Sequence, residues 1–209
     1  MTRLIPWQQR LSTGTEDIQS EVIDWYRRTR HGKAYVPTMI WGTLQTEAYA
    51  TVILRQVVEF LGVPDDVPAG VAKRMERQQV LYDSEYHYDV ILGEQALYTN
   101  VGGPVVMRGQ MERLLRDIGR RCRPGADLPS VALGVLPTTA EVSVVPKPGF
   151  HLHGDDRAHY ELVSTGVDIT DPDELALHDK VFGALRNASS YGDATKELIR
   201  KASAFWSSR

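Results

Sequence analysis

An apolar stripe at helical spacing between Leu44 and Leu61 restricts the fold of this chain more than any other feature of its sequence. A stripe this wide predicts a helix that packs firmly on a core. The segment "GVPDDVP" ends this helix, and Asp66 with Pro68 predicts the start of an amphipathic helix through residues 69–81. The apolar positions of the first helix are Leu44, Tyr49, Val52, Ile53, Val57, Phe60 and Leu61.

Further helices are predicted on both sides of this pair. A capping box formed by Thr13 and Glu16 begins an earlier helix, which ends at Gly32. Near the other end of the chain, Asp171 and Pro172 begin a helix with a cap and a first-turn proline. Helical periodicity is also found in residues 105–122 and in a last segment that carries Leu198, Ile199, Ala202, Phe205 and Trp206.

Strands are predicted between these groups of helices, where aromatic and β-branched residues alternate with polar ones. This order predicts an α+β fold with helices at both ends packed on a small central mixed sheet. Residues 1–15 lack periodicity and are predicted to form an N-terminal arm, and residues 16–209 a single domain. The predicted strands cover residues 86–92, 130–137, 142–145, 149–154 and 160–164.

Composition excludes several classes of protein. The 24 basic and 27 acidic residues give a formal charge of -3, which argues against the broad positive surface that nucleic-acid backbones require. Cys122 is the single cysteine, so the chain forms no internal disulfide and no cysteine-rich zinc cluster. No apolar run approaches the roughly 18 residues needed to cross a bilayer. We therefore expect a cytoplasmic protein without membrane or direct nucleic-acid partners.

The segment "GFHLHGDDRAH" concentrates three of the six histidines. Alternation along a strand places Phe150 and Leu152 on one face and His151 and His153 on the other. Two histidines on one face would supply two metal ligands, with Asp155, Asp156 or His159 as a third. Paired histidines on a strand are more often metal-free, and no nucleotide-, phosphate- or zinc-binding motif occurs in the chain. We therefore predict no metal and no cofactor.

Six ordered blocks of sequence resemble a known family. The resemblance spans roughly residues 16–205 and is to the domain of unknown function that forms the C-terminal part of many actinobacterial Xre-type helix-turn-helix regulators, also described as antitoxin-like regulators. It implies an actinobacterial origin, a link to transcription regulation, and a domain that takes an effector, a partner protein or a second copy of itself. The blocks are "WGTLQTEAYA", "VAKRMERQQVL", "VILGEQALY", "VGGPVVMRGQMERLL", "VALGVLP" and "DPDELALHDKVFGAL".

The chain departs from this family in three places. Residues 16–30 form one predicted helix with no second helix at helix-turn-helix spacing, so direct DNA binding is not carried over. The family usually has Pro-Gly before "LQT", where this chain has Trp41 and Gly42, a change that alters a turn or adds an aromatic surface. The histidines at positions 151 and 153 are not usual in the family.

The candidate ligand-binding residues each have a structural alternative. Gln45 and Thr46 open a helix, where free backbone donors favour a polar ligand, but both also suit helix capping. Arg74 and Arg77 would clamp a carboxylate or phosphate, unless salt bridges to Glu76, Glu94 or Asp65 occupy them. Glu94 follows a strand and also suits a helix N-terminus. The full set of candidates is Trp41, Gln45, Thr46, Arg74, Arg77, Gln78 and Glu94.

Two functions from different classes remain open at this stage. The first is a stand-alone sensing or interaction domain that binds a small metabolite or a small acidic partner protein, without direct DNA binding. The alternative is a repurposed enzyme of actinobacterial secondary metabolism, of isomerase, lyase or cyclase type, that uses His151, His153, Asp155 and Glu161 as acids and bases. A homodimeric scaffold without a ligand is the structural option beside them. The absence of a catalytic motif favours the first function.

Overall fold

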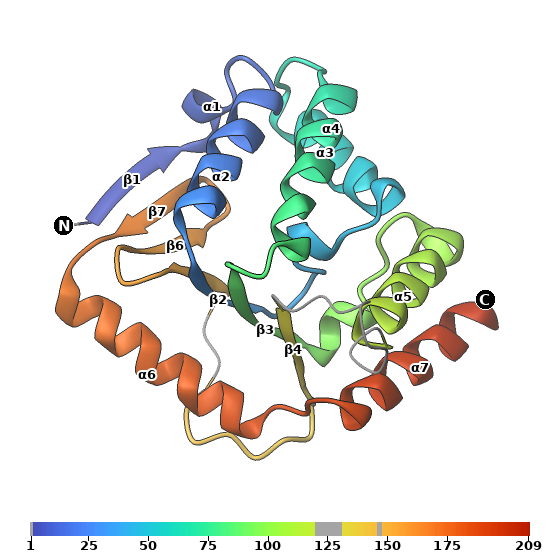
Figure 1. Ribbon diagram of the computed structural model, residues 1–209. Helices are drawn as coiled ribbons and strands as arrows, with labels where there is room; N and C mark the ends of the chain where they lie inside the picture. The colour runs from blue at the N-terminus through green and yellow to red at the C-terminus, as the bar shows by residue number, and fades with distance from the viewer. Residues whose placement is uncertain (1, 120–130, 146–147) are drawn as a thin grey trace.

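A mixed seven-stranded sheet runs through the computed structural model, which describes residues 2–119, 131–145 and 148–209 (Figure 1). Its strands lie in the order β1-β7-β6-β5-β2-β3-β4. The strands β2, β3 and β4 are parallel to one another, and the remaining pairs are antiparallel. The strand bounds are β1 Thr2–Pro6, β2 His31–Val36, β3 His87–Gly93, β4 Val131–Leu136, β5 Phe150–His153, β6 Arg157–Glu161 and β7 Thr165–Ile169.

Helices connect the parallel strands and extend from both ends of the sheet, so the predicted α+β class is confirmed. The helices α3 and α4 connect β2 to β3, and α5 connects β3 to β4. The α-helices are α1 Trp7–Arg10, α2 Glu16–Arg28, α3 Glu47–Leu61, α4 Val67–Arg77, α5 Gly103–Gly119, α6 Pro172–Ala188 and α7 Asp193–Ser207, and the short 3-10 helices are η1 Gly42–Leu44, η2 Gln78–Tyr82 and η3 Glu94–Leu97.

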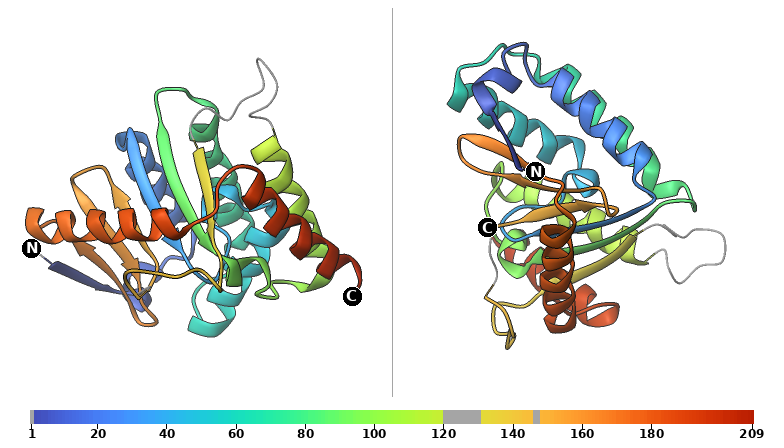
Figure 2. Two further views of the ribbon diagram at one scale, coloured as in Figure 1. Left: turned by 90° about the horizontal axis from the view of Figure 1, so that it is seen from below. Right: turned by 90° about the vertical axis from the view of Figure 1, so that its left-hand side faces the viewer.

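The two faces of the sheet bury separate apolar clusters. The larger cluster joins α2, α3, α5 and α7 to β3 and β4, and contains Trp41, Tyr88 and Met107. The second cluster packs Phe182 of α6 against Phe150 of β5. Figure 2 shows α6 on the face of the sheet opposite α2 and α4. Each face of the sheet is therefore closed by its own set of helices, and α6 fixes the orientation of β5.

Three strands lie outside the predicted set. The predicted helix end at Gly32 is wrong, because α2 ends at Arg28. The segment His31–Val36 forms the central strand β2 and pairs with both β3 and β5. The edge strand Thr2–Pro6 pairs with Thr165–Ile169, which also pairs with β6. Residues 2–10, predicted to belong to an arm, thus contribute a strand and the short helix α1. These strands form because distant segments of the chain pair, and the local alternation of apolar and polar residues does not predict such pairing.

The strand predicted at residues 142–145 is wrong. These residues form no strand, although Val142 and Val144 pack against the cluster beneath α6. Val145 is exposed. The alternation of apolar and polar residues here reflects side-chain packing of an irregular segment rather than a hydrogen-bonded ladder. The end of the helix predicted for residues 105–122, including Cys122, lies outside the described residues.

The start of α2 also corrects the prediction of a capping box. The helix begins at Glu16, and Thr13 bonds the Asp17 carboxylate instead of a free backbone donor. Asp66 supplies the acceptor: its Oδ1 accepts from the Thr15 N–H at 2.6 Å, and its Oδ2 accepts from the Glu16 N–H at 2.7 Å. The Thr15 hydroxyl donates to the same carboxylate at 2.7 Å. A side chain from the α3–α4 connection therefore caps α2 and joins this helix to α3 and α4.

These bonds set the ionisation of Asp66. Burial opposes the charged form, but the hydrogen bonds from Thr15 and Glu16 outweigh it and hold the pKa of the carboxyl below its usual value.

Within the described part of the chain, no helix is both long enough and apolar enough to cross a membrane.

We predict that Asp66→Ala lowers the free energy of unfolding by about 2 kcal/mol, because two backbone donors at the start of α2 lose their charged acceptor. Urea denaturation at neutral pH measures the loss. The neighbouring Asp65 is a matched control, since its exposed carboxylate pairs with Arg55 at the surface and accepts one long bond, at 3.3 Å, from the Val67 N–H, so Asp65→Ala should cost clearly less than Asp66→Ala. Equal losses in the two variants would contradict the capping role.

Candidate functional site

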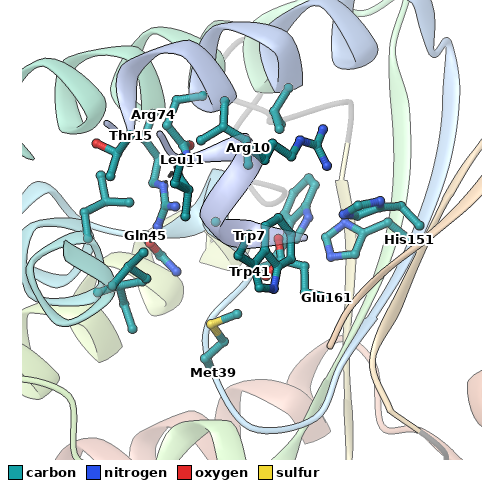
Figure 3. Close-up of a pocket in the computed structure, with 18 of the residues that line it drawn as sticks. Trp7, Arg10, Leu11, Thr15, Met39, Trp41, Gln45, Arg74, His151 and Glu161 are labelled. Carbon is teal, nitrogen blue, oxygen red and sulfur yellow. Dashed lines mark hydrogen bonds between the residues drawn. The ribbon is translucent and has the colours of Figure 1, made fainter. Parts of the chain in front are cut away.

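A cavity of about 640 Å³ lies between α2, α3 and α4 on one side and β5 and β6 on the other (Figure 3). Its size falls in the range of ordinary small-molecule sites. The helix α4 packs against both α2 and α3, and this helical layer forms the wall opposite the strands. The apolar part of the lining consists of Trp7, Leu11, Ile18, Val22, Trp25, Tyr26, Val36, Met39, Trp41, Ile53, Leu54, Val57, Phe60, Leu61, Leu162 and Val163.

Apolar stripes of two helices provide much of this lining. The face of α2 that carries Ile18, Val22 and Trp25 faces the cavity. On α3, Phe60 is 81% exposed, so its predicted core position is wrong. It lies at the open side of the cavity, together with the exposed Val163 of the β6–β7 connection. The stripes are therefore wider than the core needs, and the excess apolar surface surrounds the cavity.

The predicted alternation along β5 is confirmed. Phe150 and Leu152 pack in the cluster beneath α6, whereas His151 and His153 line the cavity. His151 lies opposite His159 of β6 in the strand register, and His159 lines the same cavity. The His151 and His153 rings stack with centroids 6.3 Å apart. Sheet pairing thus gathers three histidines on one wall.

Burial keeps two of these histidines neutral. Desolvation is the main cause that lowers the pKa of His151 to about 4 and that of His153 to about 3, and the neighbouring histidines lower both further. Glu161 acts in the opposite direction on His151 but does not offset burial. At neutral pH both rings are therefore uncharged and can donate or accept a hydrogen bond to a ligand.

His159 is oriented by an acid from the neighbouring strand. Its Nδ1 lies 2.7 Å from Oδ1 of Asp168 on β7. Burial opposes ionisation of Asp168, but the bond from His159 and the nearby Arg157 and Arg10 hold the pKa of its carboxyl below the usual value. His159 also packs edge-on against Trp25, with ring centroids 5.2 Å apart. The pair leaves Nε2 as the free nitrogen of the ring.

The described residues contain no group of three or more histidine, cysteine or acidic side chains arranged to hold a metal ion. Asp155 and Asp156, two of the residues that could have completed a site with His151 and His153, lie exposed in the β5–β6 turn. Neither belongs to the cavity lining.

Arg74 and Arg77 enter the cavity wall from the last turn of α4. Both approach one amide oxygen, Oε1 of Gln19 on α2: Arg74 Nε donates to it at 3.1 Å and Arg77 Nη1 at 3.5 Å. A second amide, that of Gln45, accepts from Arg74 Nη1 at 2.8 Å. Arg77 is 6% exposed, and its Nε has no hydrogen-bond partner among the described residues.

The three acidic residues predicted as salt-bridge partners of Arg74 and Arg77 do not contact them. Glu76 pairs with Arg27 and Lys73, and Asp65 pairs with Arg55. Glu94 accepts hydrogen bonds from the backbone and hydroxyl of Thr138 at 2.8 and 3.0 Å. All three predicted salt-bridge partners are thus engaged with other groups.

Both guanidinium groups are desolvated. Burial, followed by repulsion from Arg77, lowers the pKa of Arg74 to about 9. Burial likewise lowers the pKa of Arg77, although Tyr26 and Glu161 act in the opposite direction. Arg74 is partly exposed and lines the cavity. A pKa of about 9 leaves Arg74 protonated at neutral pH.

A loop with little regular structure, residues 40–46, completes this wall. Gln45 Nε2 donates to the Ile40 carbonyl at 2.7 Å, which leaves its Oε1 free to accept from Arg74. Trp41 is buried and donates to the Tyr26 hydroxyl at 3.0 Å, so it faces the core and cavity rather than an outer surface. A Cβ at Gly42 would lie 2.5 Å from Arg77 Nη2, so glycine lets the guanidinium approach the backbone.

The remaining candidates have structural contacts outside the lining. Thr46 caps α3, as the alternative reading expected, by accepting from the Tyr49 N–H at 3.2 Å. Gln78 donates to the Gln45 carbonyl at 2.7 Å and so supports the loop from behind. The cavity thus contains the candidates Trp41, Gln45, Arg74, Arg77, His151, His153 and Glu161, and it excludes Thr46, Gln78, Glu94 and Asp155.

Several lining residues were not singled out from the sequence. Gln19 lies in the apolar face of α2, and a polar residue interrupting an amphipathic stripe is the signal that could have found it. Arg10 carried no such signal: its guanidinium lies 5.0 Å from the centre of the Trp25 ring and pairs with Glu21 at 2.9 Å. Only the pairing of β1 with β7 brings this region to the cavity.

A family profile described as a domain of unknown function (DUF5753) matches residues 21–201. The chain belongs to this family. The match includes α4, β5, β6 and the part of α2 from residue 21 onward, and therefore most of the cavity wall. No curated protein sequence matches the chain at a significant level.

Two solved structures show a distant likeness to this DUF5753 domain. TrmBL2, an archaeal chromatin protein whose structure shows a novel mode of DNA binding, aligns with 8% identity and a TM-score of 0.42 over 91% of this chain and 55% of that chain. NucT from Helicobacter pylori aligns with 10% identity and a TM-score of 0.40 over 91% of this chain and 97% of that chain. The chain spans little more than half the length of TrmBL2. Likeness at this level carries no argument about the site.

We predict that the domain loses stability as the pH falls from 7 to 5, by about 2 kcal/mol for each of His151 and His153. The unfolded chain binds protons near pH 6.5, whereas the folded histidines stay neutral until about pH 4 and 3. The stability that comes from keeping these histidines neutral is therefore fully present above the pKa of histidine in the unfolded chain, and it is lost as the pH falls below that pKa. Urea denaturation at both pH values measures the difference.

Variants at two histidines test the origin of this dependence. His153→Asn retains a polar atom for the contact between Nδ1 and the Thr29 hydroxyl, and it should remove about half of the loss. The exposed His31 is the matched control, and His31→Asn should leave the loss unchanged. A His153→Asn variant with the full pH dependence would show that burial of this ring is not its cause.

Proposed function

We propose that this domain is a sensing module that binds a small, largely apolar molecule in the cavity between α2–α4 and β5–β6. The single observation that carries the proposal is the cavity itself, with its volume of about 640 Å³ and its mainly apolar lining. A few polar groups converge on it, among them the neutral His151 and the amide of Gln45. This combination is typical of small-molecule sites.

A role in transcription regulation extends this proposal. The resemblance to the C-terminal domains of Xre-type regulators supports a module that passes ligand occupancy to a regulator. The formal charge of -3 supports action without direct DNA contact. Binding of a labelled promoter fragment at physiological salt would contradict that part. A small acidic partner protein remains a prediction from the sequence.

We predict that the neutral fluorophore 1-aminoanthracene binds the domain with a rise in fluorescence, because the cavity shields it from water. Ile53 of α3 lines the cavity, so Ile53→Trp should fill part of the space and reduce the dye affinity at least about ten-fold. Val105 is 73% exposed on α5 and outside the lining, and Val105→Trp is the control that should leave binding unchanged. Absence of dye binding to the wild type would overturn the proposed function.

An acid–base enzyme is the second candidate, and the bond between His159 and Asp168 favours it. An acid that holds one ring nitrogen orients the other for proton transfer. His151, His153 and Glu161 line the same cavity, whereas Asp155, the fourth predicted catalytic residue, does not.

Incubation with a cell-derived metabolite extract, followed by mass spectrometry, tests this candidate. We expect an enzyme to deplete a metabolite over time, and His159→Asn to abolish the depletion while the protein stays folded. His178→Asn, in the helix α6, is the control, because His178 lies outside the cavity lining. Full turnover by the His159→Asn variant would remove His159 from the reaction.

A further inference from the structure

We propose that the ligand is a monoanionic carboxylate with an apolar body, whose carboxylate is held between Arg74 and Arg77. The inference rests on the proposed function, because it requires the cavity to bind a small molecule. It goes further in assigning the head group of that molecule, the residues that recognise it and the direction in which its apolar part extends.

The first argument is that the guanidinium groups have hydrogen-bond acceptors but no carboxylate in direct contact, since Glu161 acts on both only from beyond 4.0 Å. Gln19 and Gln45 offer neutral amide oxygens, and no carboxylate of the described residues lies within 4.0 Å of either arginine. Burying unpaired charge is costly, and natural proteins pair buried charges. An anion that entered the cavity would supply the missing charge.

The second argument is the unused donor capacity of Arg77. Its side chain is 6% exposed, its Nε has no partner in the described part of the chain, and its Nη1 has only the 3.5 Å contact with Gln19. Glycine at position 42 lets Nη2 approach the backbone, because a Cβ there would lie only 2.5 Å from it. A carboxylate accepts two parallel N–H bonds from such a fork. Arg74 and Arg77 are three residues apart on α4, so both can turn toward one ligand.

A count of charges on the cavity wall sets the charge of the ligand. Arg10 pairs with Glu21, and His159 pairs with Asp168. Burial keeps His151 and His153 uncharged. Arg74, Arg77 and Glu161 then remain as lining charges without an ion pair among the described residues. Two positive groups and one negative group leave a single positive charge to be balanced. A carboxylate matches it, whereas a dianionic phosphate exceeds it.

The position of the apolar side chains sets the direction of the ligand. Arg77 is buried beside Tyr26, with its guanidinium 5.2 Å from the ring centre, at the inner end of the cavity. Among the large apolar residues of the lining, Phe60 at 81% and Val163 at 88% are the most exposed. A ligand with its carboxylate at the arginines would therefore extend its apolar body past Trp41 and Met39 toward this open side (Figure 3).

Isothermal titration calorimetry with 2-naphthoate and the uncharged, equally shaped 2-naphthamide tests the head group. We expect the wild type to bind naphthoate about ten- to hundred-fold more tightly than naphthamide, because hydrogen bonds to a charged group are stronger than those to a neutral amide. A third probe, 2-naphthyl phosphate, should bind less tightly than naphthoate. Equal affinity for naphthoate and naphthamide, or preference for the phosphate, would overturn the inference.

Two variants locate the charge. Gln19→Glu places a carboxylate of nearly unchanged shape between the two arginines, and it should remove the preference for naphthoate without loss of stability. Arg77→Met should reduce the affinity for naphthoate about ten-fold or more and leave that for naphthamide unchanged. The controls are Gln79→Glu, exposed on η2, and Arg55→Met on α3, which lie outside the lining and should retain the preference. Persistence of the preference in both test variants would overturn the inference.

The outcomes separate this inference from the proposed function. Binding of 1-aminoanthracene without preference for naphthoate would leave the apolar cavity as a binding site and remove the arginine clamp. Failure of the wild type to bind 1-aminoanthracene would overturn the proposed function and with it this inference.

Discussion

Two guanidinium groups buried against neutral amide oxygens are the constraint on which the rest of the structure depends. Arg74 and Arg77 come from α4, Gln19 from α2 and Gln45 from the loop after β2. These segments must all be placed before the arginines have any acceptor. Because buried charge without acceptors is strongly unfavourable, the packing of α2 on α4 and the course of the loop are coupled to one another.

Side-chain amides hold that loop where backbone pairing does not. Gln110 of α5 donates to the Leu44 carbonyl at 2.9 Å and accepts from the Thr46 N–H at 2.7 Å, so one side chain satisfies two backbone groups. Gln78 and Gln45 satisfy the carbonyls of Gln45 and Ile40. The loop therefore has a defined shape, and with it the position of the Gln45 oxygen that faces Arg74. Rigid support of this kind suits a preformed binding site.

Much of the site could be predicted from local patterns, and the failures share one cause. Alternation correctly placed His151 and His153 opposite Phe150, because side chains on a strand point to alternate faces. The spacing of Arg74 and Arg77 correctly placed them on one side of a helix. Glu94 and Thr46 were equally plausible candidates, yet both contact distant groups outside the cavity. Which partner a polar side chain meets is decided by segments far away in the sequence.

The sequence by itself determined the helical stripes, the helix start at Asp171, the polar face of β5 and the α+β class, since each depends on periods of two or 3.6 residues along a short stretch. Tertiary structure alone decided that Asp66 caps α2 and that β1 joins the sheet beside β7. It also decided that Glu76, Asp65 and Glu94 are bonded elsewhere, which leaves two arginines unpaired in a cavity. The physical reason is that periodicity is a local property, whereas charge pairing and enclosed space arise only where distant segments meet.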